Sequence, residues 1–197
     1  LGVYCLCGIN KIVIPQFLTF NFYFFKFCII IDTHAHLNFP DFKDDWPAVF
    51  ARAKRVGVAA IINVASDLVN AEKAVNISRQ VAQGLYAAIG FHPLYTGDIK
   101  DSDLEILSLL AQDKKVVAIG ETGLDYSENP DRGKQTKVFE ELIGLGLQLQ
   151  KPVIVHCRES EYEVLAILQK YPKLRGVMHC FPGDWALAQK VLALGFL

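Results

Sequence analysis

The sequence predicts an α/β fold in which helices cover a parallel β-sheet. From Cys28 onward, short apolar runs alternate with longer segments whose apolar residues recur at helical spacing. The apolar runs are nearly continuous, which is typical of parallel strands buried on both faces. Two architectures fit this pattern. One is an open, doubly wound sheet with a single switch point, and the other is a (β/α)8 barrel whose strand ends meet in one mouth.

Six strands and the start of a seventh are expected from the apolar runs. Helices are expected between them, with starts at an Asp-Trp-Pro segment (residues 45–47) and after Ser66, and stops at Gly57 and Gly84. The expected strands cover about 28–33, 58–64, 85–90, 116–120, 152–155, 175–178 and, just beginning, 195–197. The later helices are expected at about 102–112, 134–149, 160–170 and 184–194.

The composition limits the partners that this chain can attract by charge alone. The 197 residues carry a formal net charge of −1, so no basic excess draws it to nucleic acid, and a polyanion would need local charge or bound cations. Five cysteines without regular spacing argue against a disulfide framework and favour a reducing compartment. A cytoplasmic location is expected, or a nuclear one in a eukaryote, with no stable protein partner implied.

Residues 1–27 differ from the rest and form an apolar extension of uncertain status. The segment is rich in aromatic residues and starts with Leu1, and Lys11 and Lys26 are its only charges. It resembles a signal anchor, but Pro15 and the polar residues Gln16, Asn21 and Lys26 interrupt it and no small-residue cleavage site follows. We expect a non-native extension or an unusual leader, and not a membrane anchor, before a domain that covers residues 28–197.

Two histidines close together follow the first expected strand. In Asp32-Thr33-His34-Ala35-His36, the side-chain period of a strand places His34 and His36 on the same face. Alone, such a pair is more often chance or a hydrogen-bonded structural pair than a metal site. The other histidines change this interpretation. Every histidine of the chain, and Glu121, comes directly after an expected strand, and this favours a barrel mouth: His34, His36, His92, His156 and His179.

Imidazole and carboxylate ligands suit divalent cations such as Zn²⁺, Mn²⁺ or Mg²⁺. The candidates outnumber the three protein ligands that one catalytic metal usually takes, so two ions are expected. Glu121 would bridge them and act in catalysis, because it is the acid that directly follows a strand among these ligands. The ions would activate a water molecule and stabilise negative charge on the substrate.

Five short motifs, in this order, resemble those of the TatD family of metal-dependent deoxyribonucleases, which are TIM barrels of the amidohydrolase-like superfamily. The resemblance implies hydrolysis of DNA phosphodiester bonds, often from a 3′ end. It also implies that His34 and His36 hold one metal, His156 and His179 the other, and Glu121 both. The motifs are Asp32–Leu37, Gly90–Pro93, Ile119–Tyr126, Pro152–Arg158 and Met178–Gly183.

One departure from the family concerns the end of the chain. The family's barrel supplies a metal-binding aspartate from its last strand, whereas this sequence stops near the seventh strand, and a whole barrel typically needs about 250 residues. We therefore expect a C-terminally truncated barrel from a longer gene product. The alternatives are a related binuclear hydrolase that acts on another ester or amide, and an inactive fragment.

Three further residues near the mouth have weaker assignments. His92 could contact a substrate phosphate or be hydrogen-bonded in the turn before Pro93. Arg158 could grip a phosphate or pair with a helix carboxylate. Asp125 could accept a hydrogen bond from a ligand histidine and orient it, or serve only as a loop acid or helix cap.

Overall fold

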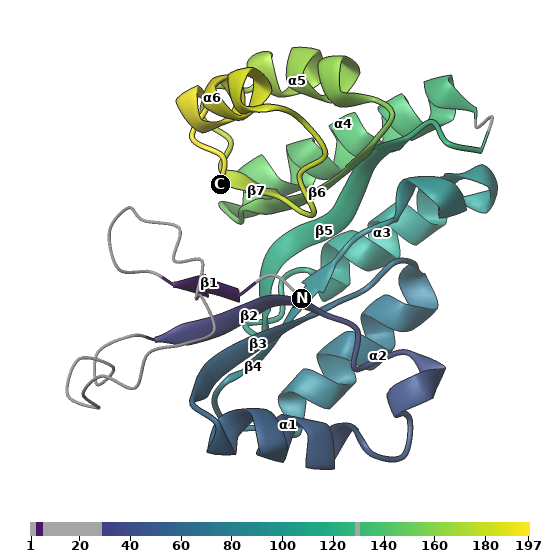
Figure 1. Ribbon diagram of the computed structural model, residues 1–197. Coiled ribbons are helices and arrows are strands. Elements are labelled where there is room, and N and C mark those ends of the chain that lie inside the picture. Colours follow the sequence, from purple (N-terminus) through teal and green to yellow (C-terminus); the bar gives the residue numbers. More distant parts are fainter. Residues whose placement is uncertain (1–2, 6–28, 129–130) are drawn as a thin grey trace, which may run out of the picture.

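The computed structural model describes residues 3–5, 29–128 and 131–197 and shows a half-barrel, with parallel strands curled around a concave face and helices on the outside (Figure 1). The strands lie in the sheet in chain order, from β1 to β7. The curl and this order confirm the barrel and exclude the doubly wound sheet. The strands are β1 (Val3–Cys5), β2 (Ile30–Ala35), β3 (Val58–Val64), β4 (Leu85–Ile89), β5 (Val116–Asp125), β6 (Val153–Arg158) and β7 (Gly176–Met178).

Each pair of successive strands from β2 to β7 is parallel, and helices link most of them across the outer face. The backbone of Phe196 also pairs with Gly176 in a parallel bridge, where the sequence predicts the start of another strand. The helices are α1 (Trp46–Arg55), α2 (Leu68–Arg79), α3 (Asp101–Leu110), α4 (Arg132–Leu149), α5 (Glu161–Gln169) and α6 (Trp185–Ala193), with short 3-10 helices η2 (Pro40–Phe42) and η3 (Pro93–Asp98).

The helix starts follow from side-chain capping. The cap of α2 is Asp67, one residue after the predicted Ser66. The Asp67 carboxylate accepts the free N–H of Asn70 at 2.8 Å. The Asp131 carboxylate does the same for Lys134 at the start of α4. These caps fix where α2 and α4 begin.

The sheet buries apolar side chains on both faces. On the outer face, side chains such as Ile89 and Ile119 pack in one core with Phe139 and Leu142 of α4. On the concave face a smaller cluster fills the space between strands. Burial on both faces explains why the strands are almost continuously apolar in sequence. The concave cluster consists of Val64, Ala88, Ala118 and Ile154.

The β5 strand is longer than predicted, which changes where Glu121 lies. The sequence places a strand end at Gly120, but β5 continues to Asp125 because Thr122 to Asp125 pair with residues of β6. The register is irregular between Ile119 and Thr122, so Glu121 lies at this irregularity inside the strand. The prediction that Glu121 directly follows a strand is therefore wrong. The prediction is wrong for His34 and His156 too, since both lie within the C-terminal halves of their strands.

Most of the apolar extension, residues 1–2 and 6–27, lies outside the described residues, as does residue 28, so the predicted status of the extension stays open. The described part, β1, pairs antiparallel with β2, with Val3 opposite Asp32. Across residues 3–5, 29–128 and 131–197, none of the helices has the length and apolar character needed to cross a membrane.

Candidate metal centre

Two groups of potential metal ligands lie at the C-terminal ends of the parallel strands. In each group, one donor atom from every residue lies within 4.8 Å of the others. The first group takes two residues from the β2 segment and one from β5. The second takes one residue each from the loop after β4, from β5 and from β6. The groups are His34, His36 and Glu121, and His92, Asp125 and His156.

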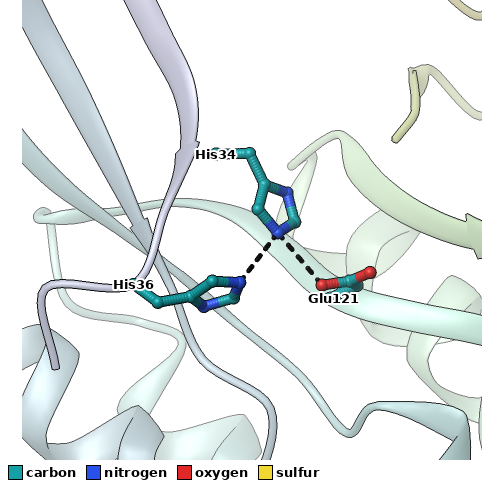
Figure 2. Close-up of side chains that lie close together, drawn as sticks. All are labelled: His34, His36 and Glu121. Carbon is teal, nitrogen blue, oxygen red and sulfur yellow. Dashed lines mark hydrogen bonds and ion pairs between the residues drawn. The ribbon is translucent and has the colours of Figure 1, made fainter. Parts of the chain in front are cut away.

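In the first group, three potential metal-ligand atoms converge on one point (Figure 2). His34 Nε2 lies 3.1 Å from Glu121 Oε2 and 3.2 Å from His36 Nε2. The other ring nitrogen of His36, Nδ1, donates to the carbonyl oxygen of Val64 at 2.9 Å. With its proton on Nδ1, His36 presents the lone pair of Nε2 to this point, which is the arrangement a metal-bound histidine adopts.

The carboxylate of Glu121 connects the two groups. Its Oε1 lies 2.8 Å from His156 Nδ1, while Oε2 faces His34. The side chain is buried, and burial raises the pKa of the carboxyl group. Hydrogen bonds from His156 and His34 outweigh this effect and bring the pKa well below its ordinary value. Glu121 therefore stays ionised and has one oxygen in each group, as a bridging ligand requires.

In the second group, the ring of His156 contacts both Asp125 and His92. Its Nε2 is 2.9 Å from Asp125 Oδ2, and its Nδ1 is 3.1 Å from His92 Nε2. Burial lowers the pKa of His156, but the hydrogen bonds to Glu121 and Asp125 raise it by more, so its net pKa is raised. Burial and the nearby charge of His156 lower the pKa of His92 to about 4, so His92 is neutral at physiological pH.

The Asp125 carboxylate is held from two sides. Its Oδ1 accepts hydrogen bonds from the backbone N–H and the hydroxyl of Ser127, and Oδ2 faces His156. Burial raises the pKa of Asp125, and these hydrogen bonds, with that of His156, lower it by more. The position agrees with the predicted orienting role of Asp125, and it also places the carboxylate within reach of a metal ion shared with His156.

The remaining predicted residues lie around these groups. The ring of His179 stacks on that of His34, with centroids 3.5 Å apart and an interplanar angle of 12°. His179 belongs to neither ligand group, so its role as a ligand stays a prediction. Arg158 is exposed at the end of β6. A cavity of about 220 Å³ on the concave face opens beside His34 and His179 and is otherwise lined mainly by apolar residues, including Ile62 and Ile154.

The chemistry of these groups fits divalent cations. Imidazole nitrogens and carboxylate oxygens are the ligands that Zn²⁺ and Mn²⁺ take in proteins, and carboxylates also suit Mg²⁺. Two imidazole nitrogens, from His34 and His36, and a carboxylate oxygen of Glu121 lie close enough to one another to bind a single cation. The sequence pattern did not assign His92 as a ligand. The available signal was its position at the C-terminal end of β4, because the other candidates also lie toward the C-terminal ends of their strands.

Comparisons with known proteins agree with this geometry. The model of the family described as TatD related DNase matches residues 31–197. The chain is 34% identical over 171 residues to a Bacillus subtilis protein named an uncharacterized metal-dependent hydrolase, YabD, and covers 67% of it with 85% of its own length. It is 30% identical over 169 residues to a protein of Erwinia tasmaniensis named 3′-5′ ssDNA/RNA exonuclease TatD, where 84% of the chain covers 65% of the relative.

Solved structures show the same similarity. The crystal structure of YjjV, a TatD homologue from Escherichia coli, superposes with a TM-score of 0.78 at 33% identity, over 84% of this chain and 65% of that one. A TatD-family hydrolase from Entamoeba histolytica superposes with a TM-score of 0.77 at 29% identity, over 84% of this chain and 62% of that one. The chain thus spans about two thirds of the length of the proteins that it matches.

Proposed function

Because this chain belongs to the family of TatD-related DNases, we propose that it hydrolyses phosphodiester bonds of DNA with two divalent metal ions. The family match and the names of relatives place the chain among metal-dependent hydrolases. The observation that carries the proposal is the buried carboxylate of Glu121, which faces His34 with one oxygen and His156 with the other. A carboxylate shared in this way is what two neighbouring cations require.

The ligand groups define what each side chain would do. His34, His36 and Glu121 would hold one ion, and Glu121 and His156 the other, with His92, Asp125 or His179 as further contacts. When bound, the ions supply a water molecule of lowered pKa and positive charge against the phosphate. The main-chain carbonyl of Val64 orients His36, and the carboxylate of Asp125 orients His156.

The substrate would enter from the open side of the strand ends. Arg158 is exposed there, and its planar guanidinium suits a phosphate oxygen pair. His92 is neutral and lies beside His156, so it suits either a phosphate contact or a metal contact. The name of the Erwinia tasmaniensis relative supports cleavage of single strands from the 3′ end. We therefore propose that single-stranded DNA with a free 3′ end is the preferred substrate.

The test is cleavage of a single-stranded oligonucleotide labelled at its 5′ end, with Mg²⁺, Mn²⁺ or Zn²⁺ and with a chelator. We expect metal-dependent shortening from the 3′ end, and a loss of at least about 10²-fold in Glu121→Gln, because that variant lacks the shared charge. Glu72→Gln is the matched control, since Glu72 is exposed on α2 and belongs to neither ligand group.

Full activity of Glu121→Gln would contradict the proposal. Cleavage of a lactone, an aminoacyl ester or a phosphotriester with DNA left intact would show a related hydrolase with another substrate. Metal binding without turnover of any of these substrates would identify a chain that holds the ions but does not catalyse.

A further inference from the structure

The Gln135 side chain lies in the first turns of α4 and is almost completely buried, with 1% of its surface exposed. It is a large polar residue in a region of apolar packing, beside Val138 and Phe139 of the same helix. A buried amide is stabilising only if its donors and acceptor all find partners. We infer that Gln135 is a positioning residue that holds two segments around His156: the loop that carries His92, and the C-terminal end of β5, which carries Asp125.

All the hydrogen bonds of the Gln135 side-chain amide are to main-chain groups of Asp125 and Pro93. Its Oε1 accepts from the backbone N–H of Asp125 at 3.0 Å, and its Nε2 donates to the carbonyl oxygen of Asp125 at 3.0 Å. The same Nε2 donates to the carbonyl oxygen of Pro93 at 3.2 Å. Gln135 therefore holds both main-chain groups of the last residue of β5 and the residue that directly follows His92.

The hydrogen bonds of Gln135 to Asp125 and Pro93 fix the main chain next to the second ligand group. Asp125 presents its carboxylate to His156 at 2.9 Å, and His92 presents Nε2 to the other nitrogen of the same ring at 3.1 Å. The three residues come from three different segments, and the Asp125 and His92 segments join through Gln135. A shift of either main chain would move a donor atom relative to His156. No such bond reaches the first group from Gln135, so the two groups should respond differently to its loss.

Further contacts hold the N-terminal end of α4, where Gln135 lies. The Asp131 carboxylate caps α4 by accepting the N–H of Lys134 at 2.9 Å. The Lys134 ammonium also donates to the carbonyl of Gly97, which lies in the 3-10 helix η3 together with Pro93. The amide is also chemically specific, because a carboxylate has no donor for the two carbonyls and a thioether has no donor either.

The test compares Gln135→Met with Val138→Ala. Methionine keeps the approximate size of glutamine and removes the hydrogen bonds, whereas Val138→Ala loosens the same helix in the apolar core and leaves the hydrogen bonds of Gln135 to Asp125 and Pro93 in place. The first readout needs no metal. In Gln135→Met we expect the amide of Asp125 to exchange its hydrogen at least about tenfold faster, because its acceptor is gone. In Val138→Ala we expect that amide to exchange in step with the rest of β5.

The second readout rests on the proposed metal centre and uses zinc alone. Binding to the second group is defined as the calorimetric signal that His156→Ala abolishes. We expect Gln135→Met to weaken it by about 10- to 100-fold, the usual effect of losing a residue that supports a metal ligand, and to leave the remaining binding unchanged. Val138→Ala should leave both unchanged.

An unchanged Asp125 exchange rate in Gln135→Met would overturn the inference, and so would equal loss of zinc affinity in Val138→Ala. The DNA proposal fails in a different way. If zinc binding and its dependence on Gln135 are as expected but no oligonucleotide is cut, the positioning role stands and the substrate is wrong. If His156→Ala abolishes no zinc binding, the metal part of the inference falls together with the proposed centre.

Discussion

The imidazole rings of His34 and His179 stack face to face, with centroids 3.5 Å apart, although they come from opposite ends of the parallel sheet. His34 belongs to β2 and His179 follows β7, and these strands are not neighbours in the sheet. The contact therefore depends on the curl of the half-barrel, which brings both ends of the sheet over the concave face (Figure 1).

This stacked position gives His179 a pH-dependent effect on stability. Burial lowers the pKa of His179 to about 4, from an ordinary value of 6.5. Between these values the unfolded chain binds more protons than the folded chain, so the free energy of unfolding falls as the pH drops through this window. In His179→Phe the ring can still stack but no longer titrates, so we expect a smaller fall.

Urea unfolding of the metal-free protein between about pH 7 and pH 4 measures this effect. The unchanged chain and His179→Phe are compared by how steeply the free energy of unfolding falls with pH. The comparison is needed because His156 has a raised pKa and shifts stability in the opposite direction. A steeper decline in His179→Phe than in the unchanged chain would contradict the prediction.

Asp125 can be tested for the two roles that its position allows. If it only orients His156, asparagine retains an oxygen that accepts the hydrogen bond from Nε2. We then expect Asp125→Asn to lose less than about tenfold in zinc affinity at the second group, and Asp125→Ala to lose about 10- to 100-fold. Calorimetric titration with zinc measures both. Equal losses in the two variants would show instead that the carboxylate binds the ion directly.

Gly123 is required by the close approach of β5 to β6. Its φ is 148°, and a Cβ there would lie 2.0 Å from the carbonyl oxygen of His156. We expect Gly123→Ala to lower the free energy of unfolding by about 3 kcal/mol or more, because both the strain and the clash involve backbone. The clash lies at His156 itself, so the second ligand group should be displaced as well.

Gly144→Ala is the matched control, since Gly144 lies within α4 and a Cβ there would meet nothing within 4 Å. Alanine should stabilise the helix by about 0.5–1 kcal/mol. Chemical denaturation of the two variants gives both values. If Gly123→Ala proved as stable as the unchanged chain, the close pairing of Gly123 with His156 would be wrong.

Asp113 contributes to stability away from the site. Its Oδ2 accepts a hydrogen bond from Nε of Arg79 at 2.8 Å and forms an ion pair with Nη2 at 2.7 Å, and its Oδ1 accepts from the backbone N–H of Lys115 at 2.7 Å. The Lys115 N–H, aided by Arg79, lowers the pKa of the carboxyl group, so this stabilisation is lost as the pH falls below its ordinary value of 3.8. We expect Asp113→Ala to cost about 1 kcal/mol at neutral pH.

The matched control for Asp113 is Asp45→Ala. The Asp45 carboxylate lies 4.0 Å from Arg52, and both side chains are exposed, so its loss should cost less than about 0.5 kcal/mol. Thermal or urea unfolding at neutral and acidic pH separates the two. Equal effects of the two variants would show that the two hydrogen bonds of the Asp113 carboxylate add nothing to a simple surface pair.

Most of the fold could be predicted because strands buried on both faces leave a clear signal. The runs at 58–64 and 85–90 correspond to β3 and β4 within a residue. The extent of β5 could not be predicted, because Gly120 and Gly123 read as the end of a strand. They are instead places where the neighbouring backbone comes too close for a side chain.

The candidate site was predictable as a set of residues but not as an arrangement. Strand ends with histidines indicated a shared mouth, and the structure brings His34, His36, Glu121 and His156 together there. The grouping of His92 with His156, and the stacking of His179 on His34, depend on the curl of the sheet. Sequence spacing contains no information on that curl.

The chain order of the strands also determines when the centre can form during synthesis. Because each strand from β2 to β7 pairs with the one before it, a growing chain can add strands to the sheet as they leave the ribosome. A nascent chain that ends before β6 already contains His34, His36 and Glu121, but it has no His156. If two ions bind as proposed, all the ligands of the first ion would thus be synthesised before His156, a ligand of the second.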